Sequence, residues 1–281
     1  MTAVEGELSM YVVSGATGNV GRHLVAELAA AGAPVRALTR NPGASVFPAG
    51  VEAARTSDLP LAGAEGLFLN PAAFWDGTEE VLRRAVDEGV RRVVLLSSES
   101  VSNQLAGNAI AEHHARLERA VEATGLRWVH LRPGAFAANA LNWAGMLAEG
   151  DTVYGPYADS RTAPIHEADI AAVAARALLS GEHDGTTPEL SGPESLSFTD
   201  QARILGAALD RPLRYEELPP EQARAAMEHN GIPGPIADAL LQYWEATVGK
   251  DVPVSGEVER ITGRAPRSFA QWAEENAGKF R

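Results

Sequence analysis

The chain has 281 residues, of which 45% are hydrophobic and 22% charged, a composition that suits a globular protein with a large core. Its formal net charge of -13 argues against partners that are bound through basic residues, namely nucleic acid and anionic membrane surfaces. The absence of cysteine excludes disulfides, thiolate metal sites and cysteine nucleophiles.

No apolar run approaches the ~20 residues that span a bilayer. The first nine residues lack the basic and apolar regions of a secretory signal. We therefore expect a cytoplasmic protein that acts on a small molecule, without nucleic acid, membrane or metal.

The first half of the chain alternates short apolar runs with amphipathic stretches, which is typical of repeated βαβ units. This pattern predicts strands at 10–14, 35–39, 66–70, 91–97 and 127–132, and helices at 19–31, 78–88 and 108–124. The first of these helices has Val20, Leu24 and Leu28 on one face. The fold class expected is α/β, with a doubly wound parallel sheet of the Rossmann type.

After Gly134 prolines become frequent and the predicted elements become shorter. We expect a Rossmann core at 1–137, to which 161–191 returns. The segments 138–160 and 192–281 should form a smaller, mostly helical domain on the substrate side.

A glycine-rich loop follows the first predicted strand and leads into a helix, as a dinucleotide-binding loop does. It reads Gly15-Ala16-Thr17-Gly18-Asn19-Val20-Gly21. Gly15 would permit a tight turn, Gly18 a close approach of the pyrophosphate, and Gly21 the packing of the helix on the strand. The helix N-terminus would then offer N–H donors to the phosphates. All seven residues are therefore predicted to bind the cofactor.

The end of the second predicted strand distinguishes between NAD and NADP. Sites for NAD place an acidic residue about 20 residues after the glycine loop to bind the ribose 2′-hydroxyl. Here that region reads Thr39-Arg40 and has no acid. Because arginine suits a 2′-phosphate, the sequence predicts NADP(H).

Several motifs give the chain a resemblance to a known family. Besides the glycine loop they are Leu38-Thr39-Arg40-Asn41-Pro42, Leu95-Leu96-Ser97-Ser98, Leu131-Arg132-Pro133-Gly134, Asp169-Ile170-Ala171, 191–197 and 261–266. Together they are similar to the NmrA-like branch of the atypical short-chain dehydrogenase/reductases. The resemblance implies either an NADPH-dependent reductase of quinones or other small molecules, or a protein that senses NADP(H) through a partner.

The same resemblance locates the catalytic groups. Catalytic members of the family carry Tyr-x-x-x-Lys on the helix after the Ser-Ser strand, but Ile110 takes the Tyr position here and His114 the Lys position. A histidine followed four residues later by an acid, Glu118, resembles the quinone-reductase type. His114 would contact the nicotinamide ribose or donate a proton; the alternative is a core histidine.

Further cofactor contacts are expected at strand ends. Asp58 stands where the family contacts adenine, although the segment 57–64 is shorter than usual and lacks room for the usual helix. Asn70 and Pro71 should border the nicotinamide, and Ser97 ends the central strand at the edge where such sheets bind ligands.

Substrate-binding candidates lie beyond the strand ends and in the smaller domain. They are the aromatic residues Phe74, Trp75, Phe136, Trp143 and Tyr154, with Asn139 as a polar group and Glu99 as a base. Aromatic residues are more often core, and a lone Glu is more often a loop charge.

The sequence favours an NADPH-dependent oxidoreductase of a small, aromatic or quinone-like substrate. The alternatives are a non-catalytic NADP(H)-binding regulator with a protein partner and, third, a non-redox isomerase or cyclase.

Overall fold

The computed structural model describes residues 9–74, 77–103 and 107–280, and these divide into two compact units. Unit 1 holds the described residues of Met1–Ser97, Arg116–Leu131 and Ile170–Pro188. Unit 2 holds those of Ser98–Ala115, Arg132–Asp169 and Glu189–Arg281.

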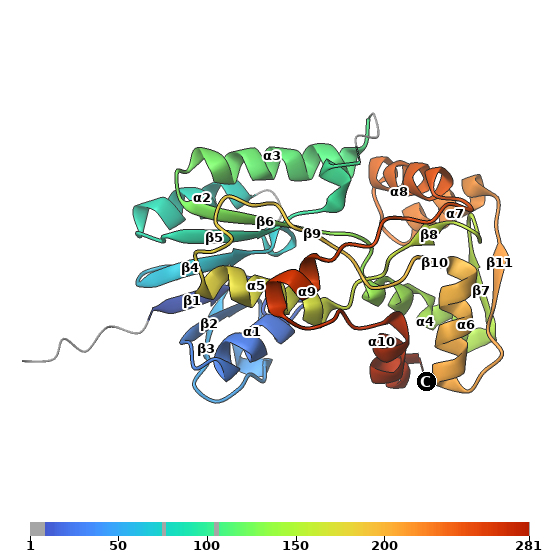
Figure 1. Cartoon of the computed structure of the whole chain (residues 1–281), viewed down its shortest axis with the longest axis horizontal. Coiled ribbons are helices and arrows are strands. Elements are labelled where there is room, and N and C mark those ends of the chain that lie inside the picture. The colour runs from blue at the N-terminus through green and yellow to red at the C-terminus, as the bar shows by residue number, and fades with distance from the viewer. Residues whose placement is uncertain (1–8, 75–76, 104–106, 281) are drawn as a thin grey trace, which may run out of the picture. The chain divides into compact units, whose positions relative to one another are not determined.

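A seven-stranded parallel sheet runs in the order β3-β2-β1-β4-β5-β6-β9 (Figure 1). Its strands are β1 (Met10–Val13), β2 (Val35–Thr39), β3 (Glu52–Arg55), β4 (Ala64–Leu69), β5 (Arg92–Leu96), β6 (Arg127–Pro133) and β9 (Glu189–Leu190). The order reverses between β1 and β4, which is the switch point of a doubly wound sheet, where ligands bind beyond the carboxyl ends of the strands. The predicted fold class is confirmed.

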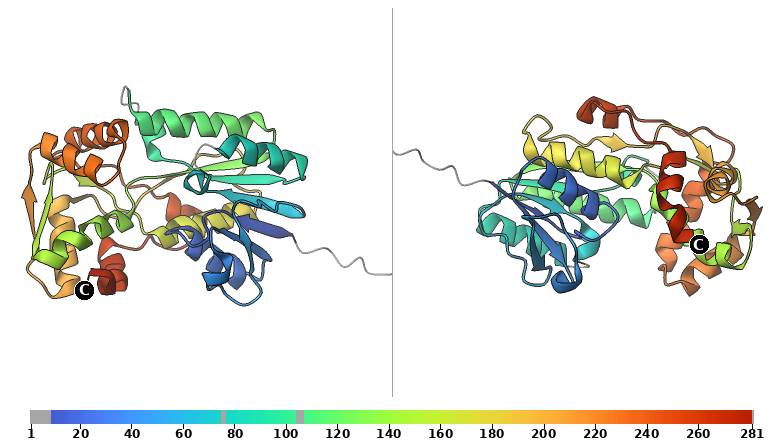
Figure 2. Two further views of the ribbon diagram at one scale, coloured as in Figure 1. Left: turned by 180° about the vertical axis from the view of Figure 1, so that it is seen from behind. Right: turned by 90° about the horizontal axis from the view of Figure 1, so that it is seen from below.

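Helices cover both faces of the sheet in unit 1 (Figure 2). They are α1 (Gly21–Ala30), α2 (Thr78–Asp87), the last turns of α3 (Ala109–Ala123) and most of α5 (Glu167–Leu179). On one face, side chains of α2 and α3 share a buried cluster with Leu67 and Val93. On the other, Gly66 has the Leu178 side chain of α5 close above it, and a Cβ there would approach Leu178 to 3.1 Å.

The edge of the sheet and the segment after it differ from the sequence prediction. β3 was not predicted, because its four residues are mostly exposed and carry no alternating apolar signal. The shortened segment 57–64 runs as turns between β3 and β4, with Leu59 at a φ of 42°. Leu59 and Leu61 are buried in the same cluster as side chains of α2, so this short segment still contributes to the core.

Unit 2 is built from short strand pairs and helices. β7 (Thr152–Gly155) pairs in parallel with β11 (Arg214–Glu217), and β8 (Arg161–Thr162) pairs antiparallel with β10 (Leu196–Ser197). The helices are α4 (Ala144–Glu149), α6 (Phe198–Leu209), α7 (Pro220–His229), α8 (Gly234–Ala246), α9 (Glu257–Thr262) and α10 (Phe269–Asn276).

The core of unit 2 is centred on Phe269 and Trp272 of α10, both fully buried. A buried carboxylate contributes to this core: Glu167 accepts hydrogen bonds from the Trp272 indole at 3.0 Å and the Ala138 amide at 2.7 Å. Within the part of the chain that the structure describes, no helix is long and apolar enough to cross a membrane.

Candidate cofactor and substrate sites

The glycine loop of unit 1 connects β1 to α1 through a tight turn. Gly15 has a φ of 64°, and its carbonyl accepts a hydrogen bond from the Gly18 amide at 2.9 Å. A Cβ on Gly21 would overlap the Gly15 carbonyl, so glycine is required where the helix meets the turn. Gly15 therefore lies in a tight turn and Gly21 where the helix contacts that turn, while their binding of a cofactor stays a prediction.

The surface of this loop fits the phosphates of a dinucleotide. Thr17, Gly18 and Asn19 are exposed, whereas Ala16 and Val20 are buried and anchor the loop. Among the described residues no side chain caps α1; in its first turn the Arg22 amide donates to the Gly18 carbonyl at 3.2 Å and the His23 amide to the Val20 carbonyl at 3.1 Å, so the donors for a phosphate would be the loop amides before them. A diphosphate can be held there by N–H donors and the positive end of the helix dipole.

The end of β2 lies next to this loop. Thr39 is buried, and its hydroxyl lies 3.5 Å from that of Thr17. Arg40 is exposed directly after the strand, and Asp58 is exposed on the turn after β3, where its carboxylate accepts a hydrogen bond from the Ser57 hydroxyl at 3.1 Å. Contacts of Arg40 and Asp58 with a nucleotide remain predictions.

Asn70 joins the ends of β4 and β1. Its backbone N–H donates to the Ser14 hydroxyl at 2.8 Å, and its side-chain oxygen accepts a hydrogen bond from the Ala72 backbone N–H at 3.1 Å. A Cβ on Gly15 would lie 2.8 Å from the Asn70 side-chain nitrogen, so Asn70 stands against the glycine turn. Pro71 is buried and begins a 3-10 turn, Pro71–Ala73.

The Ser97 hydroxyl is hydrogen-bonded to a side chain of α3. Its buried hydroxyl donates a hydrogen bond of 2.6 Å to the buried carboxylate of Glu118 on α3. A cofactor could then use only the acceptor side of this hydroxyl. The acid found four residues after His114 in the sequence is therefore the partner of Ser97 in unit 1.

His114 lies on the part of α3 that belongs to unit 2. It is half-buried, and its ring meets that of His113 edge to face, with 5.3 Å between the ring centres. Its predicted contact with a nicotinamide ribose stays a prediction.

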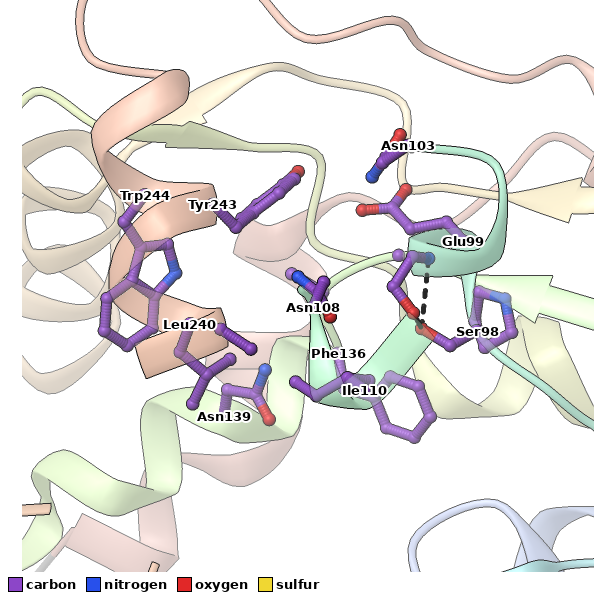
Figure 3. A pocket seen from close by; sticks show the side chains of 15 residues that line it. Ser98, Glu99, Asn103, Asn108, Ile110, Phe136, Asn139, Leu240, Tyr243 and Trp244 are labelled. Atoms are coloured by element: carbon purple, nitrogen blue, oxygen red, sulfur yellow. Dashed lines mark hydrogen bonds between the residues drawn. The ribbon is translucent and has the colours of Figure 1, made fainter. Parts of the chain in front are cut away.

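Unit 2 contains a cavity of about 190 Å³ (Figure 3). It is lined by Ser98, Glu99, Ser100, Asn103, Asn108, Ile110, Pro133, Gly134, Ala135, Phe136, Asn139, Ala239, Leu240, Tyr243 and Trp244. The lining combines flat aromatic walls with several amide and hydroxyl groups, and none of these described residues is Lys, Arg or His. Such a cavity suits a small, flat, uncharged molecule.

Glu99 is the only ionisable carboxyl among those lining residues. It begins the 3-10 turn Glu99–Val101, which the Ser98 hydroxyl caps by accepting from the Ser100 amide at 3.2 Å. Burial is the largest influence on the carboxyl and raises its pKa; the charge of Glu189 raises it further, while the Tyr243 hydroxyl, as a hydrogen-bond donor, lowers it. The net pKa is raised, which favours the neutral acid.

Gly134, which follows β6, makes space for this carboxyl. A Cβ at position 134 would lie 2.6 Å from one carboxyl oxygen of Glu99 and 3.2 Å from the other. The glycine therefore lets the Glu99 side chain occupy its place in the cavity.

Three of the predicted substrate residues meet in this cavity, namely Glu99, Phe136 and Asn139. Ile110, which takes the position of the family's Tyr, also lines it.

The other predicted aromatic residues have different places. Phe74 ends the 3-10 turn after β4 and packs against the core of unit 1. Trp143 packs against the core of unit 2 and meets Tyr215 edge to face, whereas Tyr154 is 47% exposed. These three do not line the cavity, and Trp75 lies outside the described residues.

The sequence did not predict that residues of α8 line the cavity of unit 2. Ala239 and Tyr243, and likewise Leu240 and Trp244, are four residues apart and share one face of this helix. That spacing was a detectable signal, although it could equally mark a helix packed on a core.

Comparison with known proteins agrees with these features. The NAD(P)H-binding family matches residues 15–180. The (4-alkanoyl-5-oxo-2,5-dihydrofuran-3-yl)methyl phosphate reductase of Streptomyces griseus is 36% identical, over 96% of this chain and 99% of that protein. The NAD(P)H azoreductase of Xenophilus azovorans is 30% identical, over 96% of this chain and 99% of its own length.

Among solved structures, the NADPH-dependent quinone oxidoreductase of Escherichia coli complexed with NADPH superposes with a TM-score of 0.78. The match covers 95% of this chain and 99% of that one at 24% identity, a likeness of fold. The family match extends over more than half of the chain, and the relatives cover nearly all of it. The chain therefore belongs to the NAD(P)H-binding family, as its resemblance to the NmrA-like reductases predicted.

Proposed function

We propose that this protein is an NADPH-dependent reductase of a small aromatic or quinone-like compound. The glycine loop and Arg40 would hold the dinucleotide, and the cavity of unit 2 is the candidate site for the acceptor. The observation that carries the proposal is the joint presence of a phosphate-fitting loop and an aromatic cavity in a chain that aligns with reductases over nearly its full length.

The residues of the cavity limit the chemistry that is proposed. A reduced nicotinamide, when bound, supplies a hydride. This chain has Ile110 where the family's Tyr would stand as acid, so its own contribution is to orient the acceptor between apolar walls and to exclude water. Quinones and azo compounds suit such a site, because they accept a hydride without a strong protein acid.

A non-catalytic NADP(H)-binding regulator is the second candidate, and the replacement of Tyr and Lys by Ile110 and His114 favours it. In that case the dinucleotide would bind with no acceptor turned over, and a protein partner would read the bound state.

The test is oxidation of NADPH, followed by its absorbance, against a panel of quinones, azo dyes, enones and imines. We expect turnover with quinones or azo dyes and none with the Gly18→Val variant, which serves as the control for cofactor-dependent oxidation. Tight binding of NADPH without turnover of any member would contradict the reductase and favour the regulator.

A further inference from the structure

The carboxyl of Glu99 is the one acidic side chain among the described residues that line the cavity of unit 2. It is directed into the cavity from the turn after β5, opposite the Tyr243 hydroxyl of α8 (Figure 3). Gly134 leaves it room, and no lining residue supplies a positive charge to balance a carboxylate. A carboxyl in such surroundings is stable as the neutral acid, which carries a proton to donate.

The lining also indicates which ligands the cavity excludes. A phosphate or sulfonate group needs Arg, Lys or a set of N–H donors, and it is repelled by a carboxylate. None of the fifteen described lining residues is basic, so no side chain there would balance the charge of such a ligand. The relative from Streptomyces griseus is named for a phosphate-bearing compound, whereas the described lining of this cavity has no basic residue to bind a phosphate.

We propose that this cavity binds an uncharged carbonyl compound, such as a quinone, whose oxygen accepts a hydrogen bond from the protonated carboxyl of Glu99. Tyr243 faces the same carboxyl and donates to its other lone pairs, which orients the acid proton toward the ligand. Phe136 and Trp244 provide the flat walls for the ring. This inference deepens the proposed function, on which it rests for the nature of the acceptor.

The groups that act on Glu99 give the proposal a directional pH signature. Glu189, exposed on β9, raises the pKa of the Glu99 carboxyl by its charge, and Tyr243 lowers it by donating a hydrogen bond. Binding of a carbonyl ligand should therefore weaken as pH rises through the Glu99 pKa. Glu189→Gln should shift that midpoint to lower pH, and Tyr243→Phe should shift it to higher pH.

The experiment is a binding titration of the full chain, without nicotinamide, by calorimetry. The probes are 1,4-naphthoquinone and 1,4-naphthoquinone-2-sulfonate, which differ by one anionic group. Because the chain contains no cysteine, the quinone meets no thiol that would form an adduct. Circular dichroism and the unfolding midpoint of each variant confirm that it is folded.

We expect the neutral quinone to bind below the pH at which Glu99 ionises, and the sulfonate to bind at least about tenfold more weakly, the loss expected for a buried charge left unpaired. Glu99→Gln, whose amide still donates, should retain affinity within a few-fold and lose the pH dependence. Glu99→Ala should weaken binding by roughly tenfold, as the loss of one hydrogen bond predicts.

Equal binding of the two quinones would overturn the proposal, as would a pH profile that survives in Glu99→Gln or does not move in the Glu189 and Tyr243 variants. NADPH oxidation by the wild type is measured in parallel. If the quinones bind as predicted but NADPH is not oxidised, the proposed function is wrong and this inference is supported. If NADPH is oxidised but quinone binding does not depend on Glu99, the proposed function is supported and this inference is wrong.

Discussion

Single residues in the glycine loop determine whether a dinucleotide can approach the chain. Gly18 is exposed, and a Cβ there would lie 3.1 Å from the Gly15 carbonyl, tight even before a ligand arrives. A branched side chain at this position would cover the N–H groups that the pyrophosphate needs.

We expect Gly18→Val to weaken NADPH binding by more than about 100-fold, because several phosphate hydrogen bonds of roughly 1–3 kcal/mol each would be lost. Fluorescence titration of NADPH measures the effect. The matched control is Gly145→Val, at an exposed position of α4 where a Cβ meets no atom outside its own stretch of helix within 4 Å. Equal affinity of a folded Gly18→Val variant and this control would mean that the dinucleotide binds elsewhere.

The raised pKa of Glu99 also has a consequence for stability. An acid whose pKa is higher in the folded chain than its ordinary value of 4.5 binds its proton more tightly when folded. Its contribution to stability is therefore fully present below the unfolded pKa and is lost as pH rises through the folded pKa. Each unit of such a shift corresponds to about 1.4 kcal/mol.

Glu99→Gln should remove this loss, so the variant should gain stability relative to the wild type as pH rises from about 4.5 to the raised pKa. Urea unfolding at a series of pH values measures the difference. The matched control is the same substitution at Glu149, an exposed residue of α4. A wild type that gains stability over Glu99→Gln with rising pH would contradict the assigned sign.

At the level of elements, α3 and α8 carry the side chains that the chemistry depends on. Ile110, His114 and Glu118 follow each other at intervals of four along α3. In the structure Glu118 accepts a hydrogen bond from Ser97, and Ile110 lines the cavity. His114 is thus left as the helix's candidate for contact with the cofactor.

His114→Gln should weaken NADPH binding modestly and leave turnover of a quinone within about tenfold, some 1.4 kcal/mol of barrier. This follows because a ribose contact is lost but no proton donor. Steady-state kinetics across pH separate the two roles, with His113→Gln as the matched control on the same helix. A collapse of turnover of about 10²-fold or more, at unchanged cofactor affinity, would instead make His114 the acid.

For the whole molecule, the cofactor should contribute to stability through linkage. A ligand present at 100 times its Kd stabilises the folded state by about 2.7 kcal/mol, provided that it does not bind the unfolded chain. The exposed arginine after β2 and the absence of an acid there predict that NADPH does this better than NADH at equal concentration.

Thermal unfolding should therefore show a larger rise in Tm with NADPH than with NADH, and Arg40→Ala should reduce the NADPH shift to the NADH level. Arg176→Ala, at an exposed arginine of α5 in unit 1, is the control for general loss of positive charge. A full NADPH preference in Arg40→Ala would show that another group recognises the 2′-phosphate.

The sequence by itself determined the parallel sheet, the glycine loop and the family. These depend on local signals: apolar runs of fixed length, glycines at fixed spacing, and a strand followed at once by a helix. β3 was missed because an exposed edge strand of Glu, Ala and Arg carries no such signal.

Only the tertiary structure decided which side chains share the cavity. Glu99, Gly134 and Tyr243 are far apart in the sequence, and their meeting depends on how α8 packs beside the segments after β5 and β6 within unit 2. The raised pKa of Glu99 has the same origin. A carboxyl's pKa depends on burial and on neighbouring charges, and both are properties of the packed chain rather than of its local sequence.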